Sequence, residues 1–386
     1  MSLSSDATPA MLRWARKSMG FSTAEVATAE KWPEQKIIDW ENGKGSPSLP
    51  QLRRLAKRYK RPLMVFYLEK PPTDFPIVRD FRLLPKNASR EYTPELNLAL
   101  RMAQEKQAWA AEYFEDAGFP RSPFLRIASL SSRIIDVAQN LRNSLGVTIE
   151  TQVSCNSDSE AFSIWKRQAE ALGFFVFQAS GVSVEEMRGC ALANAYAPTV
   201  LINSQDAYTA KTFTLIHELT HILLGSSAVT GGRDGSATES VERTERFCNS
   251  VAAEVVVPYD DFSPRVKAIR SGIDLQHVTE FARRYRVSRA MISYRVVEVG
   301  AASRSWLDKV LPLVSGPSLK KSSGPIPQHT LALSRNGAAF SRLAVSAYDA
   351  GAIHGGELSG LLSMKLKHLP KLMEQIFPHQ VDSASA

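Results

Sequence analysis

The chain has 386 residues, a formal net charge of +8 at pH 7 and an isoelectric point near 9.3. It contains no apolar run of about 18 residues, which argues against a membrane-spanning helix, and its N-terminus lacks the apolar core of a secretory signal, so we expect a cytoplasmic protein. Three cysteines (Cys155, Cys190 and Cys248) are too few for a disulfide framework or a cysteine-rich zinc site.

The first predicted elements are short helices across residues 9–68. Ser22-Thr23-Ala-Glu25 has the spacing of a helix cap, Pro33 suits a first helical turn, and the apolar side chains of residues 52–59 repeat at helical spacing. Residues 1–70 hold thirteen Lys and Arg against seven Asp and Glu, which is six of the eight net positive charges. A basic balance of this kind fits either a nucleic-acid partner or an ordinary solvated surface.

Beyond a proline-rich linker at 71–76, the pattern predicts several helices and two strands. The helices are expected at 93–117, 131–145, 158–171, 210–224, 239–257, 275–285 and 288–299, with a helical tail at 338–379. The strands are expected at 173–177 and 199–202, and further loops at 231–235 and 314–327. This pattern predicts a mainly α chain with a small β-sheet, an α+β arrangement, behind an all-α N-terminal domain.

The stretch 214–225, TLIHELTHILLG, places three polar groups on an otherwise apolar helix. Residues four apart lie on one face of an α-helix, so His217 and His221 can bind one metal ion while Glu218 reaches a water beside it. The apolar flanks predict a buried helix, and buried His and Glu side chains need partners. A metal ion with its bound water would provide partners for all three side chains. The alternative is a structural role, which is the more common one for paired histidines on a helix.

A third protein ligand is expected from the following helix, because catalytic zinc binds three side chains and keeps one position open. Glu242, Glu245 and Cys248 are the candidates there. Zinc is the expected ion, and Mn²⁺ is an alternative, because two histidines and a carboxylate suit several metals. Zinc lowers the pKa of bound water to about 7, so Glu218 can act as the general base in hydrolysis of a peptide bond.

The stretches around these residues resemble the ImmA/IrrE family of metallo-endopeptidases. The first is Val200-Leu-Ile-Asn203 with Phe213-Thr-Leu-Ile-His217-Glu-Leu-Thr-His221, and the second runs from Glu245 to Pro258. The resemblance covers about residues 160–300 and departs at Cys248, where the family has Ala. It implies that Glu245 is the third ligand, as in gluzincins. It also implies that the substrate is a helix-turn-helix repressor, whose cleavage switches on stress-response or mobile-element genes.

Residues 9–68 are similar to the Cro/repressor-type (XRE) helix-turn-helix domain, chiefly in Ile38-Asp-Trp-Glu-Asn-Gly43 and in the Leu-x-x-Leu-Ala pattern that ends at Ala56. The resemblance implies a recognition helix over about 33–39 that enters the major groove of double-stranded DNA. Gln35 and Lys36 are then candidate contacts to base edges or phosphates. The candidate phosphate contacts are Lys31, Lys44, Arg53 and Arg54.

Acidic and bulky residues in the same motif are the basis for an alternative, a repressor-like fold that no longer binds DNA. Glu25 and Glu30 lie in its first helix, and Trp32-Pro33-Glu34 stands where small polar residues are usual. A second helix-turn-helix-like pair at 273–295 carries four arginines that could meet DNA, although a packing role with a solvated basic face is more typical. These are Arg283, Arg284, Arg286 and Arg289. His277 could assist the metal site, and a structural role is the simpler interpretation.

These observations predict four regions: a helix-turn-helix domain at 1–70, a helical linker region at 71–158, a metallopeptidase domain at 159–313, and a linker with a helical C-terminal extension at 314–386. The leading hypothesis is a zinc endopeptidase that cleaves a helix-turn-helix repressor. The second hypothesis is a DNA-binding regulator or antitoxin-like protein, in which a non-catalytic metallopeptidase fold acts as a sensor or scaffold. EDTA-sensitive cleavage of a repressor would favour the first hypothesis. Bound zinc without proteolysis, together with tight binding of operator DNA, would favour the second.

Overall fold

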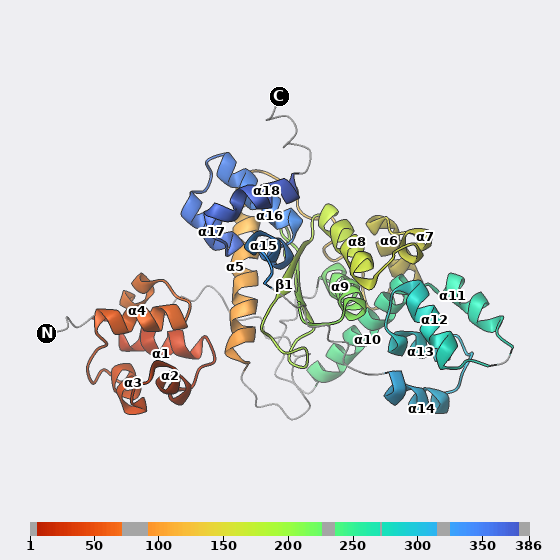
Figure 1. Cartoon of the computed structure of the whole chain (residues 1–386), viewed down its shortest axis with the longest axis horizontal. Coiled ribbons are helices and arrows are strands. Elements are labelled where there is room, and N and C mark those ends of the chain that lie inside the picture. Colours follow the sequence, from red (N-terminus) through yellow and green to blue (C-terminus); the bar gives the residue numbers. More distant parts are fainter. Residues whose placement is uncertain (1–5, 72–91, 226–235, 271, 315–324, 378–386) are drawn as a thin grey trace. The chain divides into compact units, whose positions relative to one another are not determined.

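The computed structural model describes residues 6–71, 92–225, 236–270, 272–314 and 325–377. The chain divides into two compact units, Met1–Gln104 and Glu105–Ala386 (Figure 1). The described residues are mainly helical and contain one three-stranded sheet, in the second unit, which confirms the predicted fold class. Most of the predicted linkers at 71–76 and 314–327, and the whole loop at 231–235, lie outside the described residues. No described helix is both long and apolar enough to cross a membrane.

The first unit is built from short helices: α1 (Pro9–Lys17), α2 (Thr23–Glu30), α3 (Glu34–Glu41), α4 (Leu49–Arg58), the 3-10 turn η1 (Leu63–Tyr67) and the start of α5 (Pro94–Asp116). Ser22 caps α2 in a reciprocal capping box with Glu25, which satisfies backbone donors that a helix start leaves without partners. Apolar side chains from all four helices and η1 form the core, including Leu12, Val26, Ile37, Leu52 and Phe66. The predicted string of short helices is therefore confirmed.

The sheet of the second unit has the order β1-β3-β2. Strands β1 (Phe175–Ala179) and β3 (Thr199–Asn203) are parallel, and β2 (Gly189–Leu192) pairs with β3 in the antiparallel direction. The two predicted strands are present, with the first shifted two residues towards the C-terminus because Gly173 takes a left-handed turn conformation. Strand β2 was not predicted. The three strands are almost entirely buried, so the sheet lies inside the unit.

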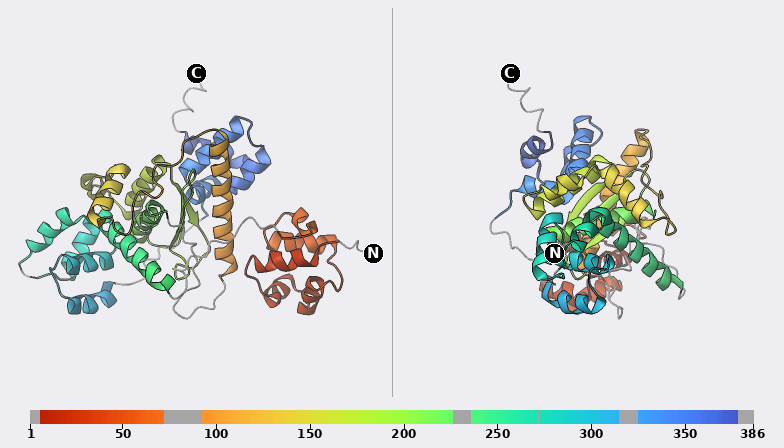
Figure 2. Two further views of the ribbon diagram at one scale, coloured as in Figure 1. Left: turned by 180° about the vertical axis from the view of Figure 1, so that it is seen from behind. Right: turned by 90° about the vertical axis from the view of Figure 1, so that its right-hand side faces the viewer.

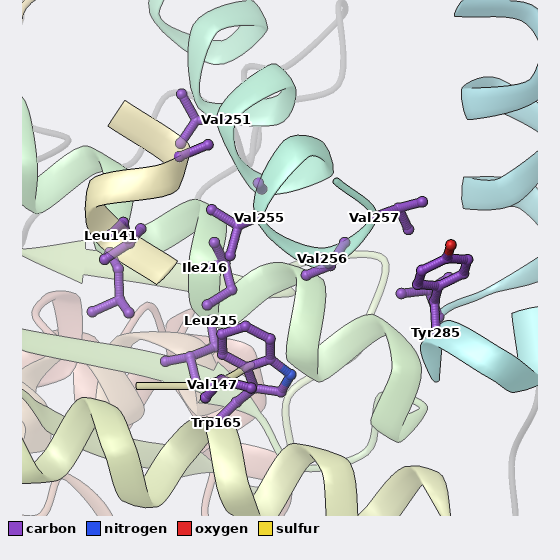
Figure 3. Close-up of a cluster of buried hydrophobic side chains, with 14 of the residues drawn as sticks. Leu141, Val147, Trp165, Leu215, Ile216, Val251, Val255, Val256, Val257 and Tyr285 are labelled. Atoms are coloured by element: carbon purple, nitrogen blue, oxygen red, sulfur yellow. The ribbon is translucent and has the colours of Figure 1, made fainter. Parts of the chain in front are cut away.

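Helices α9 (Tyr208–Leu223) and α10 (Ser236–Val256) pack against each other, and α9 also lies against β2 and β3. Apolar residues of α9 meet α8 (Asp158–Ala171) on one side and α10 on the other. Figure 3 shows Leu215 beside Trp165, and Ile216 beside Val255. Full burial of such side chains contributes about 1.5–3 kcal/mol each. The helix predicted at 210–224 is therefore buried between the apolar side chains of α8 and α10, as its apolar flanks predicted.

Residues between 137 and 149, which lie in the predicted helical linker region at 71–158, also contribute to this core. Helix α6 (Ile134–Leu145) packs along α10 and buries Val137, Ala138, Leu141 and Leu145, and α7 (Ile149–Val153) contacts α12. The apolar face of α6 repeats at helical spacing, so these side chains need a partner surface that a linker would not provide. The second unit therefore includes segments that precede the predicted start of the metallopeptidase domain.

The rest of the second unit is helical. After α10 come α11 (Tyr259–Lys267), α12 (Leu275–Tyr285), α13 (Arg289–Glu298) and α14 (Arg304–Val314), followed by α15 (Gln328–Asn336), α16 (Ala338–Asp349), α17 (Gly355–Leu362), the turn η3 (Leu366–His368) and α18 (Leu369–Ile376). The last four helices, blue in Figures 1 and 2, lie beside the second half of α5 (orange), where Trp109 makes an edge contact with Phe340. The C-terminal extension is thus packed onto the unit that contains the sheet.

Candidate metal centre and helix-turn-helix surface

Helix α9 brings two imidazoles and a carboxylate into the core. Its residues His217 and His221 are one turn apart, and their Nε2 atoms are 3.2 Å from each other. His217, Glu218 and His221 are all buried, with at most 8% of each residue exposed. Apolar residues of the same helix, such as Leu219 and Ile222, are fully buried in the core. The helix therefore holds its polar groups in fixed positions inside the protein.

Glu245 on α10 completes a three-residue cluster, which we call the metal-binding group: His217, His221 and Glu245. One Glu245 oxygen is 3.4 Å from Nε2 of His217, and the other is 3.2 Å from Nε2 of His221. The Glu245 side chain is 25% exposed, so the group faces solvent on one side. Among the residues that the structure describes, this is the one cluster of three or more His, Cys, Asp and Glu side chains that could hold a metal ion.

The spacing of these atoms fits a zinc ion. Two ligand atoms that each lie about 2.0–2.1 Å from a tetrahedral metal are about 3.3 Å apart. The two Nε2 atoms are 3.2 Å apart, and they lie 3.4 and 3.2 Å from two different oxygens of Glu245, so each separation is close to that value. A single shared proton would bridge only one pair of these side chains, whereas a divalent cation can interact with His217, His221 and Glu245 together. The donor set of two imidazoles and one carboxylate suits zinc and, less selectively, manganese.

The other two candidates for the third ligand lie elsewhere on α10. Glu242 is exposed to solvent, and Cys248, one turn after Glu245, is fully buried. Neither belongs to the metal-binding group. His277, considered as an assisting residue, instead caps α12: its ring Nδ1 lies 2.7 Å from a carboxylate oxygen of Asp274. The structure thus brings Glu245, and not these three residues, to the paired histidines.

The Glu218 side chain on α9 lies against Gly189, the first residue of β2. A Cβ atom added to Gly189 would lie 3.0 Å from Oε1 and 3.1 Å from Cγ of Glu218. It would also lie 2.4 Å from Cγ2 of Thr214, which is one turn before Glu218. Gly189 and Thr214 were not among the residues that the sequence predicted for the site, because a glycine in an unpredicted strand gives no local signal.

Side chains from three distant segments hold the C-terminal end of α10. Gln152 donates to the carbonyl of Val256 (2.9 Å) and Arg295 to that of Val257 (2.6 Å), while Arg142 donates to the carbonyl of Val255. The last carbonyls of a helix have no partner within the helix, and cations stabilise that end of its dipole. Burial lowers the pKa of Arg142 to about 10. These contacts fix the helix that carries Glu245.

The predicted DNA contacts lie on α3, on α4 and on the turn between them in the first unit. The exposed Gln35 amide donates to Asp39 (2.9 Å), and the Lys36 ammonium lies 5.3 Å from the ring centroid of Trp40. Lys44 and Arg53 are exposed, and neither makes an ion pair with a described residue. Lys44 and Arg53 are therefore better placed than Gln35 and Lys36 to contact a phosphate.

Arg54, expected as a phosphate contact, has a different partner in the structure. Its guanidinium donates to a carboxylate oxygen of Glu30 (2.6 Å), and Arg58 donates to the other oxygen (2.5 Å). Arg54 also lies over the ring of Trp32, 4.7 Å from its centroid. The Glu30 side chain is only 6% exposed, and a buried carboxylate requires such partners. Glu30 therefore helps to hold α2 and α4 together.

Two of the four arginines in the α12 and α13 pair also have structural partners. Arg284 lies 4.0 Å from Asp261, and Arg286 donates to the carbonyl of Cys155 and lies 3.9 Å from Asp158. Arg283 and Arg289 make no ion pair with a described residue. A packing role therefore explains Arg284 and Arg286, two of the four arginines, and does not explain Arg283 and Arg289.

A group of two histidines one helical turn apart and a glutamate from the next helix is typical of metallopeptidase domains. Residues 169–297 match the family model of the IrrE N-terminal-like domain, a peptidase family, and residues 12–66 match that of a helix-turn-helix domain. The chain therefore combines an XRE-type helix-turn-helix domain with a peptidase domain of the ImmA/IrrE type, which confirms the resemblance seen in the sequence. A search of curated proteins finds no match.

Proposed function

We propose that the protein is a zinc-dependent endopeptidase and that its substrate is a helix-turn-helix transcriptional repressor. The observation that carries the proposal is the metal-binding group: its two imidazole nitrogens are 3.2 Å apart, and each lies 3.2–3.4 Å from an oxygen of Glu245, close to the ligand separations of a tetrahedral zinc site. The match of residues 169–297 to a peptidase family supports the same reaction. Cleavage of a repressor would change the expression of stress-response or mobile-element genes.

The residues have distinct roles in this proposal. His217, His221 and Glu245 hold the ion, which when bound polarises the substrate carbonyl and activates water. Glu218 is next to a metal ligand in the chain and is buried, so its carboxylate can accept the proton of the attacking water. The same carboxyl group then delivers that proton to the departing amine. The apolar core around α9 limits the access of other water to Glu218.

The Glu218→Gln substitution tests the role of Glu218, because glutamine keeps the shape of the side chain and removes its basicity. We expect the variant to bind one zinc ion per chain and to cleave at least about 100-fold more slowly, within the range that general bases contribute. Zinc content and single-turnover cleavage of a candidate repressor are the two measurements. A variant that keeps its zinc and cleaves at the parent rate would show that Glu218 is not the base.

The exposed Lys44 and Arg53 favour a second candidate function in the first unit, binding of double-stranded DNA. In that case the chain is a DNA-binding regulator or antitoxin-like protein, and its peptidase fold acts as a sensor or scaffold. The two candidates are separated by one experiment on the full chain, with labelled operator DNA and a repressor in the same reaction. EDTA-sensitive cleavage supports the endopeptidase, and salt-dependent DNA binding without cleavage supports the regulator.

A further inference from the structure

The first residue of β2, Gly189, lies against the side chain proposed as the general base. Its φ angle is outside the left-handed region, so the backbone there would accept any L-residue. The requirement for glycine is therefore one of space. An added Cβ would lie 2.4 Å from Thr214 Cγ2, 3.0 Å from Glu218 Oε1 and 3.1 Å from Glu218 Cγ, whereas carbon atoms in contact are normally about 3.5–4.0 Å apart.

These three contacts lie on one face of α9. Thr214 and Glu218 are four residues apart, so both side chains face β2. The two respond differently to a new methyl group. The contact with Thr214 involves one methyl group, which rotation of the side chain would move and a serine would lack. Glu218 is contacted at Cγ as well as at Oε1, so its side chain must shift by a few tenths of an ångström, and the carboxylate shifts with it.

Strand β2 has little freedom to move away from α9, because Asn203 fixes its start. The Asn203 backbone donates to the carbonyl of Arg188 (2.8 Å), directly before Gly189. The fully buried Asn203 side chain donates to the carbonyls of Val182 (3.0 Å) and Met187 (2.8 Å). Gly189 itself lies opposite Ile202 in the ladder with β3. A side chain at position 189 would therefore press on α9 and would not be accommodated by the strand.

We propose that Gly189 is a positioning residue for Glu218: the absence of a side chain at 189 leaves the space in which the Glu218 carboxylate stands beside the metal. This inference rests on the proposed function, in which Glu218 is the base. It assigns to β2 a role in catalysis that is separate from metal binding, since the added Cβ meets none of the three ligand side chains among its nearest atoms.

The experiment compares Gly189→Ala, the double variant Gly189→Ala/Thr214→Ser, and a control, Gly360→Ala. Gly360 lies in α17, has open space around its Cα and does not have a positive φ. For each protein the zinc content, the melting temperature, and kcat and KM are measured, with a quenched fluorescent peptide that the parent cleaves, selected from a mixed-sequence library. The double variant removes the closest contact, with Thr214 Cγ2, and keeps the contacts with Glu218.

We expect Gly189→Ala to bind one zinc ion per chain, with KM within about threefold of the parent and kcat lowered more than about threefold, because a displaced base loses part of its contribution. Thr214→Ser in the double variant should restore the melting temperature and leave kcat low, while Gly360→Ala should match the parent in zinc content, kcat and KM and melt no lower. The inference is overturned if Gly189→Ala retains kcat within threefold, or if the double variant recovers kcat and melting temperature together. Those results would assign to Gly189 a role in packing alone.

A second measurement separates this inference from the proposed function. Cobalt replaces zinc in the full chain, and the visible absorption of the bound cobalt reports on the surroundings of the metal. If the parent cleaves no peptide or repressor, the proposed endopeptidase is refuted. A changed cobalt spectrum in Gly189→Ala at equal metal content, together with a moved Glu218 carboxylate in its crystal structure, would still support the positioning role. An unchanged spectrum and an unmoved carboxylate would refute it.

Discussion

The buried Arg295 is the residue whose replacement should disturb the ligand-bearing helix most. Its guanidinium donates to Glu254 on α10 (2.6 Å) and to the carbonyl of Val257 directly after that helix (2.6 Å). It also donates to Glu298 (2.7 Å), whose side chain is 54% exposed. The Arg295 side chain is only 2% exposed. In an Arg295→Met variant the carboxylate of Glu254 would remain in the core without its cation.

Removal of one partner from a buried ion pair costs about 3–5 kcal/mol, because the other charge is left without compensation. The exposed contact with Glu298 adds no more than about 0.5 kcal/mol. For a domain of this size each kcal/mol lowers the melting temperature by about 2–4 °C. We therefore expect Arg295→Met to melt roughly 6–20 °C below the parent. Zinc affinity should fall as well, because Glu245 lies on the helix that Arg295 holds.

Differential scanning calorimetry of the full chain measures this effect. The transition of the second unit is identified by its shift when EDTA removes the metal, because a ligand that binds only the folded state raises its melting temperature. Two controls accompany the variant. Glu298→Gln should change the melting temperature by less than about 2 °C, and Glu254→Gln combined with Arg295→Met should recover about 1 kcal/mol or more. Melting of Arg295→Met within 2 °C of the parent would refute this reasoning.

Three further predictions concern the metal, DNA and pH. Glu245→Ala should lose bound zinc at concentrations where the parent holds one ion per chain, as measured by elemental analysis after gel filtration; full retention would exclude Glu245 as a ligand. If the first unit binds DNA, Lys44→Ala and Arg53→Ala should each reduce the slope of log affinity against log salt by about 1, in a fluorescence titration with labelled duplex; unchanged slopes would place the contacts elsewhere. Burial lowers the pKa of Lys106 from 10.5 to about 8, so between these pH values the unfolded chain binds more protons and stability rises with pH. Chemical denaturation of Lys106→Met should show a smaller rise across that window, and an equal rise would show that burial of Lys106 is not its cause.

The paired histidines and their helix could be predicted from the sequence because the signal is local. The spacing of His217 and His221 and their apolar flanks all lie within α9, whose period a sequence shows directly, and the glycine at 225 follows its end. For the third ligand the sequence offers three candidates. Glu242, Glu245 and Cys248 share a helix, and only the packing of α10 against α9 decides which of them meets the histidines.

Strand β2 and its Gly189 could not be predicted because their signal is not local. Gly-Cys-Ala-Leu contains no β-branched or aromatic residue, so its strand propensity is weak, and it is a strand because β3 supplies the hydrogen bonds. Gly189 matters through atoms of α9 that are 25 and 29 residues away in the chain, at Thr214 and Glu218. Only the tertiary structure brings them together.

The polar contacts at the end of α10 were missed for a similar reason. Arg142, Gln152 and Arg295 come from segments 38 to 113 residues away from the carbonyls that they meet. In the sequence each is an ordinary polar residue on an amphipathic helix, where a solvated position is the usual expectation. The same limit applies to Arg54, because its neighbours in the chain do not reveal that Glu30 lies within reach.

Anomalous diffraction from crystals of the full chain, grown with zinc and measured on both sides of the zinc absorption edge, tests the central claim most directly. We predict one strong anomalous peak about 2.0–2.1 Å from the two imidazole nitrogens and from a Glu245 oxygen, with Glu218 beside it and outside the coordination sphere. A zinc-loaded crystal with no peak at this position, or with the Glu245 carboxylate turned away from the ion, would contradict that claim.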